Sequence, residues 1–226
     1  MAAAAAPFQA SAAAGGPRGA SDTARLPAEN REYKTVEYWD GRFENEAAYE
    51  WLCGFSGVGA LLVPFLSVAA PRVLVVGCGN SSFSEELARS VGAPESGARV
   101  VSIDFSATVI EAMRRRSPQL EWEVMDMTAL TFPDASFDLV IDKAAMDALV
   151  TDEGDPWDPN AETRASCAAM VSSVQRVLRP GGRFLMISFQ QPHFRKRYLT
   201  HPALSPPKVQ GIEVGMGYFF FSMQKL

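Results

Sequence analysis

The chain of 226 residues carries 21 Lys and Arg against 26 Asp and Glu, a formal net charge of -5, and 47% of its residues are hydrophobic. It has no uninterrupted apolar run of the ~18 residues that a membrane-spanning helix needs, and its mild acidity disfavours a protein that binds nucleic acid through bulk charge. Three scattered cysteines do not form a disulfide framework and fit a reducing compartment, so we expect a cytoplasmic protein.

Residues 1–30 are expected to form a disordered leader, and residues 31–226 to form one domain. The leader is dominated by Ala, Gly and Ser up to residue 24 and shows no apolar face that a core would bury. A transit peptide for an organelle is the alternative, although only two arginines occur by Arg25 and no amphipathic Arg-rich helix is visible.

Two helices are predicted first, over about 47–55 and 58–68. From residue 72 onward, short apolar runs alternate with helical patterns. The predicted strands are 73–76, 100–103, 120–124, 137–141 and 184–189. The predicted helices among them are 80–91, 106–116 with Ser106 as N-cap, and 162–178 with a stop signal at 179–182. The last segments, 209–214 and 218–223, predict a hairpin.

This alternation predicts an α/β fold: a doubly wound, mostly parallel sheet of seven strands with an antiparallel C-terminal hairpin. Right-handed crossovers place the loops that follow the parallel strands along one edge of the sheet. Ligands bind at that edge, beside the first strand, so the candidate site lies in the loops after the first four strands.

The first loop contains Gly77 and Gly79, which allow a sharp turn and close approach of the backbone to a ligand at a helix start. A dinucleotide fingerprint would have a third glycine at the position of Ser82, so the loop favours a nucleoside without a pyrophosphate. A purely structural turn is the alternative. After the second strand, the Asp104 carboxylate is suited to accept both ribose hydroxyls; alternatively, it only stabilises the dipole of the helix that follows.

The third loop contains Asp126 and Met127. Asp126 would accept from an adenine amine while Met127 packs against the apolar face of the base; alternatively, Met127 belongs to the core and Asp126 to the surface. The fourth contains Asp142 and Lys143, where Asp142 would orient or deprotonate an incoming amine and Lys143 would pair with a ligand carboxylate. A surface Asp–Lys pair is the alternative there. Asp147 is expected in the following turn or helix.

Together these loops predict a site for S-adenosylmethionine on a Rossmann-like sheet of the class I methyltransferase type. The sulfonium of that cofactor activates the methyl group, so the chain mainly has to align an unprotonated nucleophile. No metal cluster is needed, and the spacing of the two histidines suits no usual metal site.

The chain resembles the lysine methyltransferases of translation elongation factor 1A from about residue 33 to its C-terminus. The glycine loop alone fits very many methyltransferases, whereas the first and last of the matching segments are far more specific. The matching segments are Glu37-Tyr38-Trp39-Asp40-x-Arg42-Phe43, 76–81, 125–128, 132–138 and Asp142-Lys143-x-x-x-Asp147-Ala148.

The resemblance implies methyl transfer from S-adenosylmethionine to a protein lysine. It implies cofactor contacts by Trp39, Phe43, Trp51, Gly77, Asp104, Phe105, Asp126, Met127 and Lys143. Aromatic rings attract a sulfonium through their π faces. For the two tryptophans, helix packing on the sheet is the competing interpretation.

The chain departs from this family at two places near the expected site. Phe43 stands where the family often has tyrosine, and so lacks a hydroxyl. Ala144 and Ala145 stand where Gly-Thr is common, which changes the side chains expected beneath the target nitrogen. Because of this departure, one alternative function is a partner protein that binds the cofactor without catalysing methyl transfer. The other alternative is a methyltransferase that acts on a small molecule.

Two segments are expected to flank the substrate entrance. Residues 190–217 form a short roof with a basic cluster at 192–198, which would contact an acidic protein surface or RNA, or is only a solvated face. Residues 152–158 form an acidic loop that would attract a lysine-bearing substrate. Trp157 on the acidic loop is either an anchor or local packing. We expect a monomer with a protein substrate, elongation factor 1A being one candidate, and no membrane or nucleic-acid partner.

Overall fold

The computed structural model describes residues 26–213 and 217–226. Most of the predicted leader, and part of the turn of the predicted hairpin, lie outside these ranges, so the predicted domain boundary stays a prediction. The described chain begins with the 3-10 helix η1 (Asn30–Lys34) and the helix α1 (Val36–Asn45), which are followed by α2 (Phe55–Leu66).

The first α-helix lies earlier in the chain than predicted. Thr35 caps α1 by accepting a hydrogen bond from the backbone N–H of Tyr38, whereas residues 46–54 are irregular. The backbone N–H of Tyr49 donates to the side chain of Asn80 at 3.1 Å, and Leu52 has a left-handed φ of 63°. Tertiary contacts therefore override the helical pattern predicted over 47–55.

The seven-stranded, mostly parallel sheet is confirmed, with the strand order β3-β2-β1-β4-β7-β9-β8. The first five strands in that order run parallel, and β9 pairs antiparallel with both β7 and β8. The bounds are β1 (Arg72–Val76), β2 (Arg99–Asp104), β3 (Glu121–Val124), β4 (Phe137–Lys143), β7 (Leu178–Ser188), β8 (Lys208–Ile212) and β9 (Tyr218–Gln224).

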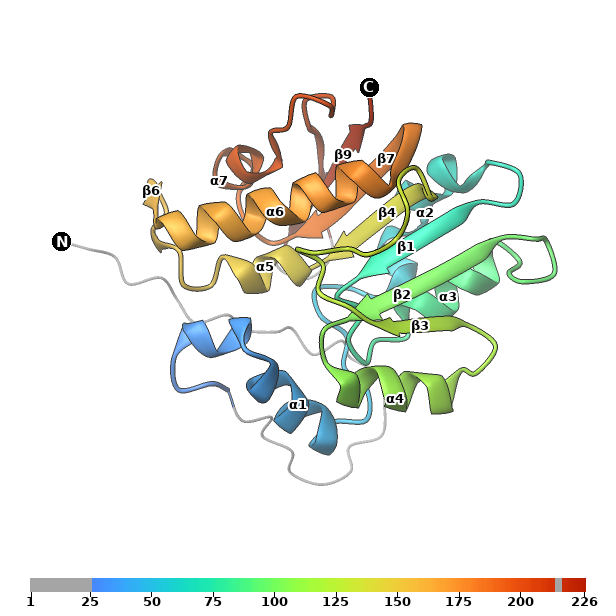
Figure 1. Ribbon diagram of the computed structural model, residues 1–226, viewed down its shortest axis with the longest axis horizontal. Helices are drawn as coiled ribbons and strands as arrows, with labels where there is room; N and C mark the ends of the chain where they lie inside the picture. The colour runs from blue at the N-terminus through green and yellow to red at the C-terminus, as the bar shows by residue number, and fades with distance from the viewer. Residues whose placement is uncertain (1–25, 214–216) are drawn as a thin grey trace.

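Helices cover both faces of the sheet, as Figure 1 shows for α6 on the nearer face. Within β1, Val73 and Val75 pack on one side with α2, α3 and α4, while Leu74 and Val76 pack on the other with α5 and α6. The continuous apolar run of this strand is thus explained by burial on both faces. The helix bounds are α3 (Phe83–Ser90), α4 (Ala107–Arg116), α5 (Ala145–Leu149) and α6 (Ala161–Val177).

The predicted start of one helix is confirmed, and that of another is wrong. Ser106 caps α4 as predicted, accepting from the N–H of Val109 at 3.2 Å. However, α3 begins three residues later than predicted, because Ser81 Oγ accepts from the N–H of Phe83 at 2.9 Å. The stop signal after α6 lies inside the irregular start of β7 rather than in a loop.

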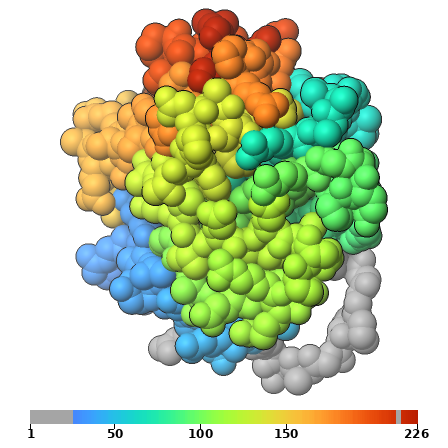
Figure 2. All heavy atoms as spheres, turned by 45° about the vertical axis from the view of Figure 1, so that its right-hand side comes forward, coloured from blue at the N-terminus to red at the C-terminus, as the bar shows by residue number. Residues whose placement is uncertain are grey.

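The segments expected around the entrance are also ordered. The acidic loop forms the two-stranded sheet β5 (Gly154–Asp155) and β6 (Asp158–Pro159), which was not predicted. The roof begins with α7 (Pro192–Arg195) and η2 (Lys196–Leu199). In Figure 2 the blue η1–α1 region lies against the lime region that includes β3 and below the orange start of α6. Among the described residues, no helix is long and apolar enough to cross a bilayer.

Candidate active site

A pocket of about 310 Å³ lies at the carboxyl ends of β1 to β4, the edge where the sequence places the ligand loops. All ten residues predicted to bind the cofactor line it, so the fold brings together side chains separated by up to about a hundred positions. They are Trp39, Phe43, Trp51, Gly77, Gly79, Asp104, Phe105, Asp126, Met127 and Lys143. Their contacts with a bound cofactor stay predictions.

The two glycines of the first loop have different roles. Both have a positive φ, 59° at Gly77 and 54° at Gly79. A Cβ added to Gly77 would lie 2.4 Å from the Cβ of Ala145, so this glycine lets β1 approach the start of α5. A Cβ on Gly79 would be no nearer than 3.8 Å to Phe43. Gly79 therefore leaves the backbone open toward the pocket.

Asp104 is buried at the end of β2, with its carboxylate fixed by two backbone donors. Oδ2 accepts from the N–H of Gly79 and Oδ1 from the N–H of Ser106, both at 3.0 Å. Burial raises the pKa of Asp104 to about 6, although these N–H groups favour the ionised form. Each oxygen keeps a further lone pair, so the carboxylate is held ready to accept two hydroxyls.

An aromatic wall closes the side of the pocket formed by η1, α1 and the following loop. Trp39 stacks on Phe43, with ring centroids 5.6 Å apart, and its indole N–H donates to the carbonyl of Tyr33 at 2.7 Å. Trp51 meets Trp39 edge-on at 5.8 Å. The Arg42 guanidinium lies 4.7 Å from the Trp51 ring centroid. Trp39 also packs on the core, so the packing and lining interpretations both hold for it.

Lys143 lies at the end of β4, and its ammonium is bound by residues from the loop after α1. Nζ pairs with the carboxylate of Glu50 and donates to the carbonyl of Trp51 at 2.9 Å. The same carboxylate accepts from Ser81 Oγ at 2.8 Å. Because an ammonium has three donors, one remains for a ligand carboxylate. Glu50 was missed by the sequence reasoning, which placed it in a helix.

Asp142 is placed differently from the expectation that it deprotonates an amine. It is fully buried in β4 and does not line the pocket. Its two oxygens accept from the N–H groups of Ala145 and Met146 at 2.7 and 3.2 Å, which fixes the start of α5. Burial, with nearby Asp147, raises the pKa of Asp142 to about 7. These contacts make Asp142 a residue that positions α5.

The departure at Ala144 has a backbone consequence. Ala144 has a left-handed φ of 70°, a conformation that glycine adopts freely and that costs another L-residue about 1–2 kcal/mol. The family's glycine at this place is therefore explained by geometry. The turn forms here without it, since the Ala144 N–H donates to the carbonyl of Ile187 at 3.0 Å.

Asp147 on α5 joins the pocket wall to the roof. Its Oδ1 accepts from Ser188 Oγ at 2.6 Å and from the Arg195 guanidinium. The exposed fractions of the Asp147 and Arg195 side chains are 2% and 0%. The basic cluster of the roof is thus not wholly a solvated face, because its central arginine forms a buried ion pair with Asp147 of α5.

The outer half of the pocket was not predicted from the sequence. It is lined by η1, the end of α5 and the start of α6, through Lys34, Leu149, Thr151, Glu162 and Ser166. The side chain of Glu162 is 83% exposed, so this half opens to solvent. Among the described residues, no group of three His, Cys, Asp or Glu side chains is arranged to hold a metal ion.

Sequence comparison places this site among methyltransferases. Residues 68–206 match the methyltransferase domain family. The chain is 42% identical over 188 residues to the EEF1A lysine methyltransferase 4 of Mus musculus, covering 80% of this chain and 71% of that protein. It is 38% identical to the human eEF1A lysine and N-terminal methyltransferase, covering 78% of this chain but only 24% of that protein.

Solved structures share the fold at low sequence identity. The N-methyltransferase NodS of Bradyrhizobium japonicum, solved with S-adenosyl-L-homocysteine, covers 87% of this chain and 99% of its own with a TM-score of 0.58 at 18% identity. TrmN of Thermus thermophilus gives a TM-score of 0.59 at 19% identity, over 75% of this chain and 48% of its own.

Proposed function

Because this chain belongs to the methyltransferase domain family, we propose that it transfers the methyl group of S-adenosylmethionine to a lysine side chain of translation elongation factor 1A. The observation that carries the proposal is the single pocket that gathers all ten predicted cofactor residues, with an outer half open to solvent. Both relatives described above are named as methyltransferases of EEF1A, and these names support the choice of substrate.

The residues of the pocket fit S-adenosylmethionine in the order of its parts along the sheet edge. Asp126 and Met127 after β3 suit the adenine, and Asp104 at the end of β2 suits the ribose hydroxyls. Lys143 at the end of β4 offers an ammonium for the amino-acid carboxylate. These groups, at three successive places along the edge, support S-adenosylmethionine as the ligand.

When bound, the cofactor supplies a methyl group already activated by its sulfonium. The chain has to hold a neutral lysine amine in line with that methyl, so that a C–N bond forms as the C–S bond breaks and the amine proton passes to solvent. The aromatic wall shields the centre from water, and the outer half of the pocket gives an extended lysine side chain a path inward. No side chain has to be a metal ligand or a covalent nucleophile.

The small-molecule alternative requires a closed, self-contained substrate pocket. Here the wall at the start of α6 includes the exposed Glu162, which favours an acceptor on a larger molecule.

The direct test incubates the purified full chain with methyl-labelled S-adenosylmethionine and with unmodified elongation factor 1A made in bacteria. We expect label in that protein at a single lysine, found by mass spectrometry, and none with an Asp104→Ala variant. In a cell extract the label should appear in one band of the same size. Label confined to low-mass material would contradict the proposal, and binding without any transfer would favour a partner module.

Replacing Lys143 with methionine should weaken S-adenosyl-L-homocysteine binding about tenfold, because the ligand carboxylate loses its cationic donor while the aliphatic stem is retained. Isothermal titration calorimetry measures the change. Lys34→Met, at the outer edge of the pocket, is the matched control and should leave cofactor affinity within a factor of two. An equal effect of both variants would show that only the general charge of the pocket matters.

A further inference from the structure

We propose that an aromatic platform beside the pocket mouth, made of Trp157, His193 and Phe194, is the docking surface for the folded protein substrate. This inference rests on the proposed function and adds to it how the substrate protein is recognised. Trp157 is 72% exposed, the largest exposure of an aromatic side chain among the described residues. An exposed tryptophan is the residue type that most often anchors a protein interface.

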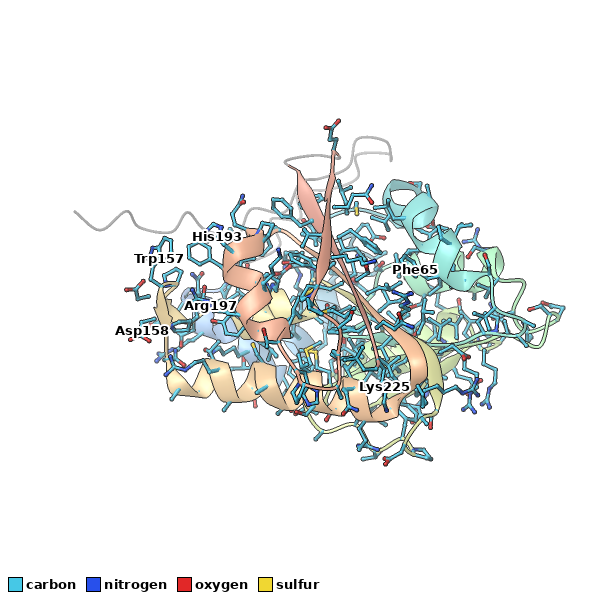
Figure 3. All side chains as sticks on the ribbon, turned by 90° about the horizontal axis from the view of Figure 1, so that it is seen from above. Phe65, Trp157, Asp158, His193, Arg197 and Lys225 are labelled. Carbon is cyan, nitrogen blue, oxygen red and sulfur yellow. The ribbon has the colours of Figure 1, made fainter. Side chains whose placement is uncertain are left out.

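The platform is assembled from two separate elements. Trp157, between β5 and β6, stacks on His193 of α7 with ring centroids 5.8 Å apart and an interplanar angle of 28°. It meets Phe194 edge-on at 4.9 Å. Figure 3 shows Trp157, His193 and Arg197 gathered at one end of the molecule, away from Phe65 and Lys225. Despite these two ring contacts, 72% of Trp157 remains exposed, so most of the indole is available to a partner.

Hydrogen bonds fix the platform in place. Arg197 Nη1 donates to the carbonyls of Pro156 and Trp157 at 2.8 and 3.2 Å, and the Trp157 N–H donates to Asp155 Oδ1 at 2.9 Å. Below it, the buried carboxylate of Glu153 accepts from Tyr198 and from Gln190. These bonds hold the backbone, and the rings of His193 and Phe194 hold the indole. A side chain that is already held in position loses little entropy on binding, so its exposed area contributes more fully to affinity.

The platform is continuous with the pocket through the chain itself. Thr151, before β5, and Glu162, after β6, both line the outer half of the pocket. The hairpin that carries Trp157 therefore starts and returns at the pocket mouth. A protein that contacts the indole would bring the adjoining part of its own surface to that mouth.

The charge of the connecting segment indicates the chemistry of the occupant. Asp152, Asp155, Asp158 and Glu162 are exposed along it. Arg164 pairs with Asp158 at 3.1 Å, and Lys34 Nζ lies 4.0 Å from Glu162. Asp152 and Asp155, which form no ion pair within the described residues, favour a basic segment, such as one that presents a lysine, over nucleic acid. The proposed occupant is therefore a folded protein whose target lysine is flanked by an apolar patch.

The test compares Trp157→Ala with the wild-type full chain in steady-state methylation of elongation factor 1A. We expect the KM for the protein substrate to rise at least tenfold, with kcat, the melting temperature and the affinity for S-adenosyl-L-homocysteine nearly unchanged. Trp157→Phe should recover part of the loss. Val68→Ala, which truncates an exposed apolar side chain after α2, is the matched control and should leave KM unchanged.

An unchanged KM in Trp157→Ala would overturn the docking surface while leaving the proposed function intact. If the wild-type chain labels a different protein in extract, the variants are compared on that protein, so substrate identity and docking are judged separately. Loss of a dimer in light scattering on Trp157→Ala, or loss of binding to a labelled single-stranded RNA, would overturn the proposal in favour of self-association or RNA. Failure of the wild-type chain to methylate any protein would overturn it as well.

Discussion

Asp104→Ala is expected to weaken S-adenosyl-L-homocysteine binding roughly 100-fold or more in calorimetry. A buried carboxylate that accepts two ribose hydroxyls contributes charge-assisted hydrogen bonds of about 1.5–3 kcal/mol each, and alanine removes both. The variant should still fold, because burial of the charge already costs stability at neutral pH, and its loss offsets the two backbone N–H groups left without the acceptor.

Asp126→Asn is the matched control for this experiment. Asp126 also lines the pocket, but it is exposed, and its Oδ1 already accepts from the N–H and hydroxyl of Thr128 at 2.7 and 2.8 Å. We expect less than about a tenfold loss there, since water competes for an exposed carboxylate. Unchanged affinity in Asp104→Ala would remove Asp104 from the ribose site.

The raised pKa of Asp104 gives the same site a pH dependence. Only the ionised carboxylate accepts both hydroxyls, and in the free protein this ionisation has a pKa of about 6. Affinity should therefore be flat above pH 7 and fall by up to about tenfold per pH unit below 6. Asp104→Asn should bind weakly and without this dependence.

The stability of the fold depends on pH in the opposite direction from the cofactor affinity. Because the folded chain holds this proton more tightly than the unfolded chain, the contribution of Asp104 to stability falls as pH rises from about 4 to about 6.

Asp147→Ala is expected to destabilise the chain by about 3–5 kcal/mol, because it leaves the Arg195 guanidinium fully buried without its carboxylate. Nη1 and Nε of Arg195 have no hydrogen-bond partner within the described part of the chain, so Asp147 is its main compensation. Thermal unfolding should show a fall in melting temperature of roughly 6–20 °C, at about 2–4 °C per kcal/mol for a domain of this size.

A double variant separates the loss of the pair from the loss of packing. Asp147→Ala with Arg195→Met removes both charges, and should be more stable than Asp147→Ala alone. Glu121→Gln breaks the exposed pair with Arg99 and should change stability by less than about 1 kcal/mol. A small effect of Asp147→Ala would mean that water reaches the guanidinium and that the roof is only loosely bound to α5.

The edge that holds the pocket was predictable because the parallel strands are continuous apolar runs. Val73–Val76 and the residues after it define both a strand buried on two faces and the loop that follows. Strand direction then places Asp104 and Lys143 along the same edge, without any knowledge of side-chain packing. The aromatic residues of the wall depended on the family resemblance, since a tryptophan in a helix is otherwise as well explained by packing.

The helix predicted over 47–55 shows where local pattern failed. Its residues are compatible with a helix, but the N–H of Tyr49 bonds to Asn80 and Glu50 pairs with Lys143, more than ninety positions away. The same reason explains Asp142. From the sequence it is an acid beside the reacting end of a ligand, and only the turn into α5 shows that backbone N–H groups occupy both oxygens.

By itself, the sequence determined the sheet, the edge that holds the pocket and the pocket residues in the loops after the parallel strands, because strand periodicity and loop position are local properties that do not depend on the details of packing. Only the tertiary structure decided which acid lines the pocket and which one caps a helix. It also decided that Asp147 and Arg195 form a buried pair, and that Trp157 is held exposed on His193 and Phe194. Those outcomes depend on residues distant in the chain. Only in the folded chain is it decided which of them form each hydrogen bond and cover each surface.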